Sequence, residues 1–212
     1  MQSRPFRSIG ILLVLAAAAV IAVISDVPVM AQQPPAGAPA GAQGRGRGPQ
    51  TPPLLMTTTA FEDGGVIPAK FVGQMGVSPE LKWSQVPMGT QSFVLLLHDP
   101  EPVLNKGSKM DITHWLIWNI PATATSLNEG VAQGAELPDG TRQVSLRGNG
   151  YMGPGAPPGP YHHYTFELYA LDTKLTVPQA TPQQAAATRT AVMQAMEGHI
   201  LGKAIIVGRF HQ

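Results

Sequence analysis

The sequence predicts a mostly β domain in which one sheet packs on another, with one helix late in the chain. Apolar stretches that are typical of strands recur between Gly and Pro residues, of which the chain has 23 and 21. One segment near the C-terminus has the spacing of an amphipathic helix. The 212-residue chain has no Cys, so disulfides are excluded and the fold must depend on a hydrophobic core.

Five apolar stretches are predicted as strands, at residues 54–61, 93–99, 112–120, 164–171 and 204–210. Side chains alternate between the two faces of a strand. The alternation therefore places Asp99 on the same face as Phe93, Leu95 and Leu97, and His98 on the other face with Val94 and Leu96. By the same rule, His114 shares a face with Leu116 and Trp118, and Trp115 shares the opposite face with Ile117.

The late helix is predicted to begin at Thr181, because Thr181-Pro182-Gln183-Gln184 matches a capping box with Pro at the first helical position. Five residues then fall on one face at helical spacing: Ala187, Ala191, Val192, Ala195 and Met196. Gly198 or Gly202 is expected to end the helix.

Residues 1–31 resemble an export signal, with Arg4 and Arg7 at the start, an apolar run over 9–24 and small residues before Ala31. Cleavage after Ala31 would make the protein periplasmic or secreted. The alternative is an uncleaved anchor in the inner membrane. Residues 32–53 are dominated by Pro, Gly, Ala and Gln and are predicted to be a disordered linker. The folded domain is then expected over 54–212.

The charge balance argues against nucleic acid as a partner. The chain has 14 basic and 13 acidic residues, and removal of Arg4, Arg7 and Asp26 with the signal leaves equal numbers. Nucleic-acid binding normally needs a basic face. Arg45 and Arg47 form a small Gly-Arg repeat, for which a solvated linker is the simpler interpretation.

Three polar clusters stand at the ends of predicted strands, around Asp99, His114 and the pair His162-His163. Each has a plain structural interpretation: an Asp before Pro commonly starts a turn, and a His among apolar residues is commonly a hydrogen-bonded core residue. Alternation puts His162 and His163 on opposite sides of their strand, which weakens metal binding by the pair. The intervening loop, residues 148–160, is rich in Gly and Pro and suits either a rigid pocket wall or a simple connection.

The order of these motifs resembles the phosphatidylethanolamine-binding protein family, in its bacterial branch. The resemblance covers nearly all of 54–212 and is carried by Ser78-Pro79-Glu80-Leu81-Lys82-Trp83, Asp99-Pro100-Glu101-Pro102, Thr113-His114-Trp115 with Asn119-Ile120-Pro121-Ala122, Gly150-Tyr151-Met152-Gly153-Pro154 with Pro157-Pro158, and His162-His163-Tyr164 with Leu168-Tyr169-Ala170-Leu171-Asp172.

The resemblance implies two antiparallel β-sheets with a few peripheral helices, and a small pocket for phosphate, phosphoryl head groups or similar anions. By position, the ligand-binding residues it implies are Asp99, His114, Pro157, Pro158, His162 and Tyr164. Three positions depart from the family pattern. Glu101 replaces an Asp, Ala156 stands where many relatives have Cys, and His163 replaces an Arg.

We therefore expect an exported, non-enzymatic protein that binds a small anion, phosphate or a phospholipid head group, without catalytic residues, metal or cofactor. The Ser residues lack the context of an activated nucleophile. The alternative is an inhibitor or regulator of a protease or another envelope protein. A hydrolase or metalloenzyme that uses Asp99, His114 and His162 is the third interpretation, since two His and a carboxylate suit a divalent metal. A homodimer is left open.

Overall fold

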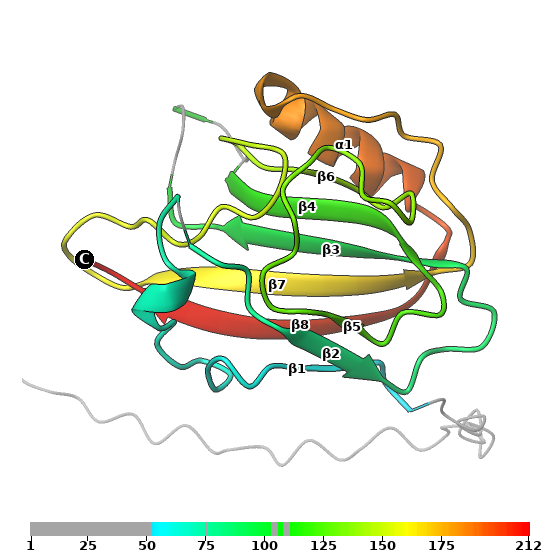
Figure 1. Cartoon of the computed structure of the whole chain (residues 1–212), viewed down its shortest axis with the longest axis horizontal. Helices are drawn as coiled ribbons and strands as arrows, with labels where there is room; N and C mark the ends of the chain where they lie inside the picture. Colours follow the sequence, from blue (N-terminus) through cyan, green and yellow to red (C-terminus); the bar gives the residue numbers. More distant parts are fainter. Residues whose placement is uncertain (1–51, 75, 103–105, 108–110) are drawn as a thin grey trace, which may run out of the picture. The chain divides into compact units, whose positions relative to one another are not determined.

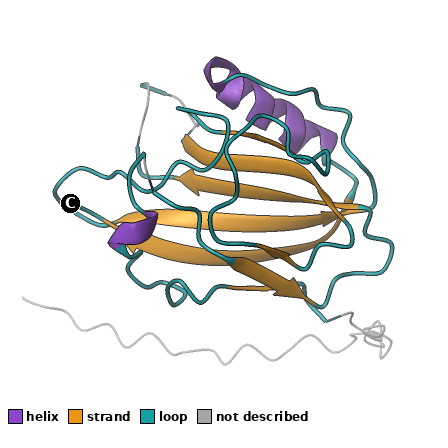
Figure 2. Ribbon diagram, in the orientation of Figure 1, coloured by secondary structure: helices purple, strands orange, loops and turns teal. Residues whose placement is uncertain are grey.

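The computed structural model describes residues 52–74, 76–102, 106–107 and 111–212, which form two antiparallel sheets and a late helix (Figures 1 and 2). The large sheet has the order β6-β4-β3-β7-β8, and the small sheet has the order β1-β2-β5. The strands are β1 (Leu55–Thr57), β2 (Leu81–Ser84), β3 (Ser92–Asp99), β4 (Ile112–Pro121), β5 (Ser126–Leu127), β6 (Arg142–Val144), β7 (His162–Leu171) and β8 (Ile200–Phe210). The predicted fold class is confirmed.

The central strands β3 and β4 of the large sheet are buried on both faces, so they lie in the middle of three layers, whereas the edge strand β8 is partly exposed. Between the two sheets, one apolar cluster joins Leu81 and Trp83 of the small sheet to Phe93, Leu95 and other residues of the large sheet. A second cluster fills the space between the large sheet and helix α1 (Ala185–Ala195), which lies over the β4 and β6 side in Figure 1. Each large apolar side chain buried in this way stabilises the fold by about 1.5–3 kcal/mol.

Strand β3 follows the predicted alternation. Phe93, Leu95 and Leu97 belong to the cluster between the sheets, while Val94 and Leu96 belong to the cluster under α1. Because every residue of 92–97 is buried, periodicity alone would not have separated a strand buried on both faces from a buried helix.

The first predicted strand, 54–61, is shorter in the structure, where β1 covers Leu55–Thr57. The Thr58 hydroxyl accepts a hydrogen bond from the Ala60 N–H at 3.1 Å and donates to the Glu80 carbonyl. A Thr side chain that binds its own backbone two residues on favours a turn, and this turn ends the strand.

The late helix begins as predicted, and four of the five residues of its predicted face pack toward the sheet. The Thr181 N–H donates to Gln184 Oε1 at 3.2 Å, as a capping box requires, and a 3-10 turn, η2 (Pro182–Gln184), precedes α1. Val192 and Met196 are buried, and Ala191 and Ala195 are partly buried against the same cluster, whereas Ala187 is exposed. Gly198 has a φ of 82° and terminates the helical segment, while Gly202 lies in β8.

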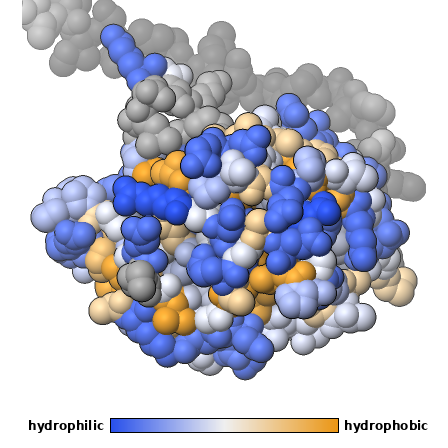
Figure 3. All heavy atoms as spheres, turned by 45° about the horizontal axis from the view of Figure 1, so that its top comes forward, coloured by the Kyte–Doolittle hydropathy of each residue, from blue (hydrophilic) through white to orange (hydrophobic). Residues whose placement is uncertain are grey.

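Among the described residues, no helix is long and apolar enough to cross a membrane. On the face drawn in Figure 3, hydrophilic and hydrophobic side chains are interspersed. The predicted signal, 1–31, and all but the last two residues of the predicted linker, 32–53, lie outside the described residues. A second 3-10 turn, η1 (Ala69–Phe71), lies beside the pocket considered next.

Candidate functional site

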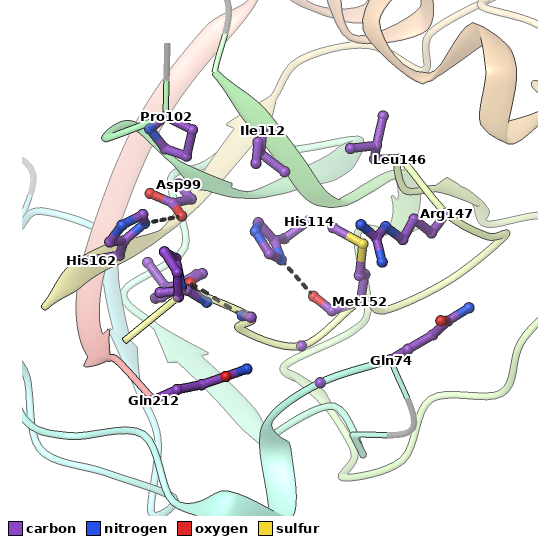
Figure 4. A pocket seen from close by; sticks show the side chains of 16 residues that line it. Gln74, Asp99, Pro102, Ile112, His114, Leu146, Arg147, Met152, His162 and Gln212 are labelled. Atoms are coloured by element: carbon purple, nitrogen blue, oxygen red, sulfur yellow. Dashed lines mark hydrogen bonds and ion pairs between the residues drawn. The ribbon is translucent and has the colours of Figure 1, made fainter. Parts of the chain in front are cut away.

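A cavity of about 300 Å³ opens at one end of the large sheet. Strand β3 ends at Asp99, and its antiparallel neighbours β4 and β7 begin at Ile112 and His162, so the three ends meet at one edge. Asp99, His114, Pro157, His162 and Tyr164 all line the cavity, as Figure 4 shows for the labelled side chains. Five of the six predicted ligand-binding residues are thus brought together.

Pro158 is the exception. It is exposed and does not line the cavity, whereas its neighbour Pro157 does. The sequence resemblance transferred both members of the proline pair, but only Pro157 is among the residues that line the cavity.

Asp99 is a buried carboxylate, with 3% of its side chain exposed. Its Oδ2 lies 2.8 Å from His162 Nδ1, and its Oδ1 accepts the Glu101 N–H at 3.1 Å. Burial raises the pKa of Asp99, and this outweighs the lowering effect of the hydrogen bond with His162. The carboxylate is therefore held in place by two donors but is poorly solvated.

His114 reaches the pocket through a β-bulge, which corrects the predicted alternation. Leu97 pairs with Trp115, and His98 pairs with Thr113, so His114 is an extra residue opposite β3. In a bulge, the extra residue and its neighbour project to the same side, and bulges often re-aim a side chain beside a functional site. His114 therefore faces the pocket, rather than the α1 side with Leu116 and Trp118.

The His114 ring is held in one orientation by the 150–160 loop. Its Nδ1 lies 2.9 Å from the Met152 carbonyl oxygen, the Met152 N–H donates back to the His114 carbonyl at 3.0 Å, and the ring packs edge-on against Tyr164 at 5.0 Å. A carbonyl oxygen only accepts, so Nδ1 carries the hydrogen, and Nε2 of the neutral ring is an acceptor. Burial lowers the pKa of His114, although the Met152 carbonyl partly opposes this effect.

His162 and His163 act separately, as predicted. His162 pairs with Asp99, while His163 Nδ1 lies 2.6 Å from Glu101 Oε1, and the His163 N–H donates to Glu101 Oε2. Glu101, which replaces an Asp of the family pattern, thus has a specific partner in His163, which replaces an Arg.

Tyr164 is a buried phenol whose oxygen is used twice as an acceptor. It receives the N–H groups of Gly155 at 3.2 Å and Ala156 at 3.1 Å. Burial, reinforced by the charge of Asp99, raises the pKa of Tyr164 to about 12. With both oxygen lone pairs occupied, the hydroxyl proton is available for donation. These two backbone N–H groups therefore hold Tyr164 in place.

The Gly- and Pro-rich loop is a rigid wall. Gly73 and Gly153 are joined by a backbone hydrogen bond, and the Tyr151 hydroxyl donates to the Phe71 carbonyl at 2.8 Å. A Cβ on Gly153 would lie 2.3 Å from the Phe71 carbonyl oxygen, so only Gly fits at this position.

Arg147 was missed by the sequence reasoning. It lies with Leu146 at the tip of a tight turn closed by a Ser145 N–H to Gly148 carbonyl hydrogen bond of 2.8 Å. It lines the cavity, and Figure 4 shows its guanidinium pointing toward His114. Arg147 is the one Lys or Arg among the described lining residues. The available signal was its position, directly before the Gly-rich loop that starts at Gly148.

The group of side chains best placed to hold a cation differs from the predicted one. Ligand atoms of Asp99, Glu101 and His162 lie within 4.8 Å of one another. His114 does not belong to this group, and its Nδ1 is engaged by Met152. The expectation that no metal binds stays a prediction.

The family model described as phosphatidylethanolamine-binding protein matches residues 57–211. A UPF0098 protein from Methanothermobacter thermautotrophicus is 40% identical over 163 residues, which are 75% of this chain and 99% of the relative. The UPF0098 protein YbhB of Escherichia coli is 36% identical over 128 residues, 56% of this chain and 78% of YbhB.

Two solved structures share the fold. Escherichia coli YbcL, described as a member of the mammalian PEBP family, superposes with a TM-score of 0.63 at 26% identity, over 75% of this chain and 98% of YbcL. The homologue CT736 of Chlamydia trachomatis superposes with a TM-score of 0.62 at 28% identity, over 76% of this chain and 98% of CT736.

Proposed function

The chain belongs to the phosphatidylethanolamine-binding protein family, and from that premise we propose that it is a non-enzymatic binding protein for a small anion, phosphate or a phosphoryl head group. Family membership itself establishes a fold that is used for ligand binding. The anion, the pocket as its site and the absence of catalysis are the proposed parts.

The observation that carries this proposal is the convergence of polar groups on one cavity. Arg147 and the Tyr164 hydroxyl are donors, and His162, backed by Asp99, is a titratable ring. The cavity of about 300 Å³ is at the small end of the range for ligand sites, and mainly apolar walls around a few polar groups are typical of such sites.

The make-up of the described lining residues favours binding over catalysis. They include no Ser, Thr, Cys or Lys, the side chains that most often serve as activated nucleophiles or Schiff-base amines. Asp99 and the two rings remain as general acids or bases, but they have no nucleophile beside them to activate.

The test is a phosphate titration of the full-length protein followed by NMR of the His side chains. We expect the ring signals of His114 and His162 to shift with saturation at millimolar phosphate, while the exposed His199 does not move. If the two pocket rings stay unmoved at that concentration, the proposal is wrong.

Three earlier expectations remain predictions. Export, with an inner-membrane anchor as its alternative, depends on residues 1–31. A role as inhibitor or regulator of a protease, and assembly into a homodimer, are not favoured by any particular feature of the described surface.

A further inference from the structure

Two of the hydrogen-bond acceptors that line the pocket are buried residues. Asp99 is one, because a carboxylate offers about four lone-pair sites, and His162 and the Glu101 N–H occupy two of them. His114 is the other: its Nδ1–H is committed to the Met152 carbonyl, so Nε2 of the neutral ring carries a lone pair that accepts. The His114 side chain is buried, 4% of the residue being exposed, yet it lines the cavity.

The donors of the pocket lie beside these acceptors. The Tyr164 hydroxyl already accepts two backbone N–H groups, so it can only donate, either to the neighbouring Asp99 carboxylate or to a ligand. Arg147 is an obligatory donor with a permanent positive charge. A ligand that satisfies both sets must have anionic oxygens for Arg147 and Tyr164, and a hydrogen for Asp99 or His114.

We propose that the pocket selects oxyanions that carry a proton, namely hydrogen phosphate and protonated phosphate monoesters, over fully deprotonated oxyanions and simple phosphodiesters. This inference rests on the proposed anion-binding function and names its ligand class. A ligand without a hydrogen places its oxygens against the Asp99 carboxylate and the His114 lone pair. The cost of leaving such buried acceptors unpaired corresponds to about 10- to 100-fold in affinity.

The surroundings of His114 disfavour protonation of its ring, which would turn Nε2 from an acceptor into a donor. The groups that face it are Arg147 on the 145–148 turn, His98 on β3, Tyr164 on β7 and Asp99 at the end of β3. Burial is the main cause that lowers the pKa of His114; the backbone hydrogen bonds with Met152 and Gly153 oppose it, and the charges of His98 and Arg147 lower the pKa further. The proton is therefore most easily brought by the ligand.

Three dianions allow the effect of the ligand's proton to be measured at constant ligand charge. At about pH 8, hydrogen phosphate, sulfate and methyl phosphate all carry two negative charges, since the second dissociation of a phosphate monoester lies near pH 6. Only hydrogen phosphate retains a P–OH group. Calorimetric titration of the full-length protein at constant ionic strength then measures the effect of the proton alone.

We expect hydrogen phosphate to bind about 10- to 100-fold more tightly than sulfate or methyl phosphate at this pH. At about pH 5, where the monoester regains its proton, methyl phosphate should approach phosphate in affinity, while dimethyl phosphate stays weak. Equal binding of the three dianions at about pH 8 would overturn the selectivity and leave the anion site standing. Binding of none of them, phosphate included, would overturn the anion site itself.

A variant pair sharpens the test. Asp99→Asn replaces an acceptor with an amide that also donates, so sulfate affinity should rise and the preference for phosphate should shrink about tenfold. Asp172→Asn is the matched control, because Asp172 also pairs with a His Nδ1 but is exposed at the other end of β7. An unchanged preference in folded Asp99→Asn, checked by its circular dichroism spectrum, would remove Asp99 from the selection.

Discussion

The two ends of β7 carry the same pair of side chains in different surroundings. At the start of the strand, His162 Nδ1 lies 2.8 Å from Asp99 Oδ2, and just beyond its end, His199 Nδ1 lies 2.7 Å from Asp172 Oδ1. The side chains of the first pair are 18% and 3% exposed, and those of the second are 46% and 43% exposed. Distance therefore does not distinguish the pairs, but burial does.

The difference in burial separates the candidate site at one end of β7 from the surface at the other. Water screens the exposed pair, and such pairs contribute about 0–1 kcal/mol to stability. At the buried end, desolvation raises the pKa of Asp99, and each polar group must be satisfied by a neighbour or by a ligand. The comparison predicts that substitutions at the pocket end have large effects and that matched substitutions elsewhere have small ones.

The largest effect is expected for Gly153→Ala in the pocket wall. The new Cβ would lie 2.3 Å from the Phe71 carbonyl oxygen, so the backbone contacts with the 71–73 segment must separate, at a cost of about 2–3 kcal/mol. Urea unfolding measures the loss. Gly155→Ala is the matched control, since its Cβ would meet nothing within 4 Å. Equal stability of the two variants would contradict the rigid wall.

The next largest effect on stability is expected for Tyr164→Phe. It leaves the N–H groups of Gly155 and Ala156 without their acceptor, which should lower the free energy of unfolding by about 1–3 kcal/mol. Tyr169→Phe removes a hydroxyl that donates to the Glu167 carboxylate, but Lys203 still donates to that carboxylate, so no buried group is left unpaired and the cost should be smaller. The same unfolding experiment compares the two variants. A larger loss for Tyr169→Phe than for Tyr164→Phe would contradict the role of the Tyr164 oxygen as acceptor for the two backbone N–H groups.

His114 should make stability depend on pH. Its pKa is lowered in the folded state, mainly by burial, so below about pH 6.5 the unfolded chain takes up a proton that the folded chain refuses. Stability is then lost as pH falls, by about 1 kcal/mol between pH 7 and 5.5. His114→Gln should lack this part of the pH dependence, and His199→Gln should retain it. Parallel pH curves for wild type and His114→Gln would refute the assignment.

The smallest effect is expected for Asp172→Asn. It breaks an exposed pair, so the free energy of unfolding should change by less than about 0.5 kcal/mol and by still less at high salt. Thermal unfolding at two salt concentrations checks this. A loss above about 1 kcal/mol would show that burial is not what separates the two ends of β7.

The sequence by itself predicted five of the eight strands of the described residues, the late helix and most of the candidate site, but not the short strands β2, β5 and β6. Alternation within one strand is a local property, which is why the opposite directions of His162 and His163, and the faces of 93–97, were predicted correctly. The ordered motifs then identified the family and drew attention to Asp99, His114 and Tyr164.

Only the tertiary structure decided where His114 points, which member of the proline pair lines the pocket, and that Arg147 joins it. A bulge depends on the register between two strands that are distant in sequence, so no pattern within 112–120 reveals it. In the same way, Arg147 lines the pocket because the 145–148 turn places it there. The charge of Arg147 and the lone pairs of Asp99 and His114 become neighbours only when the chain folds, because these residues are far apart in the sequence.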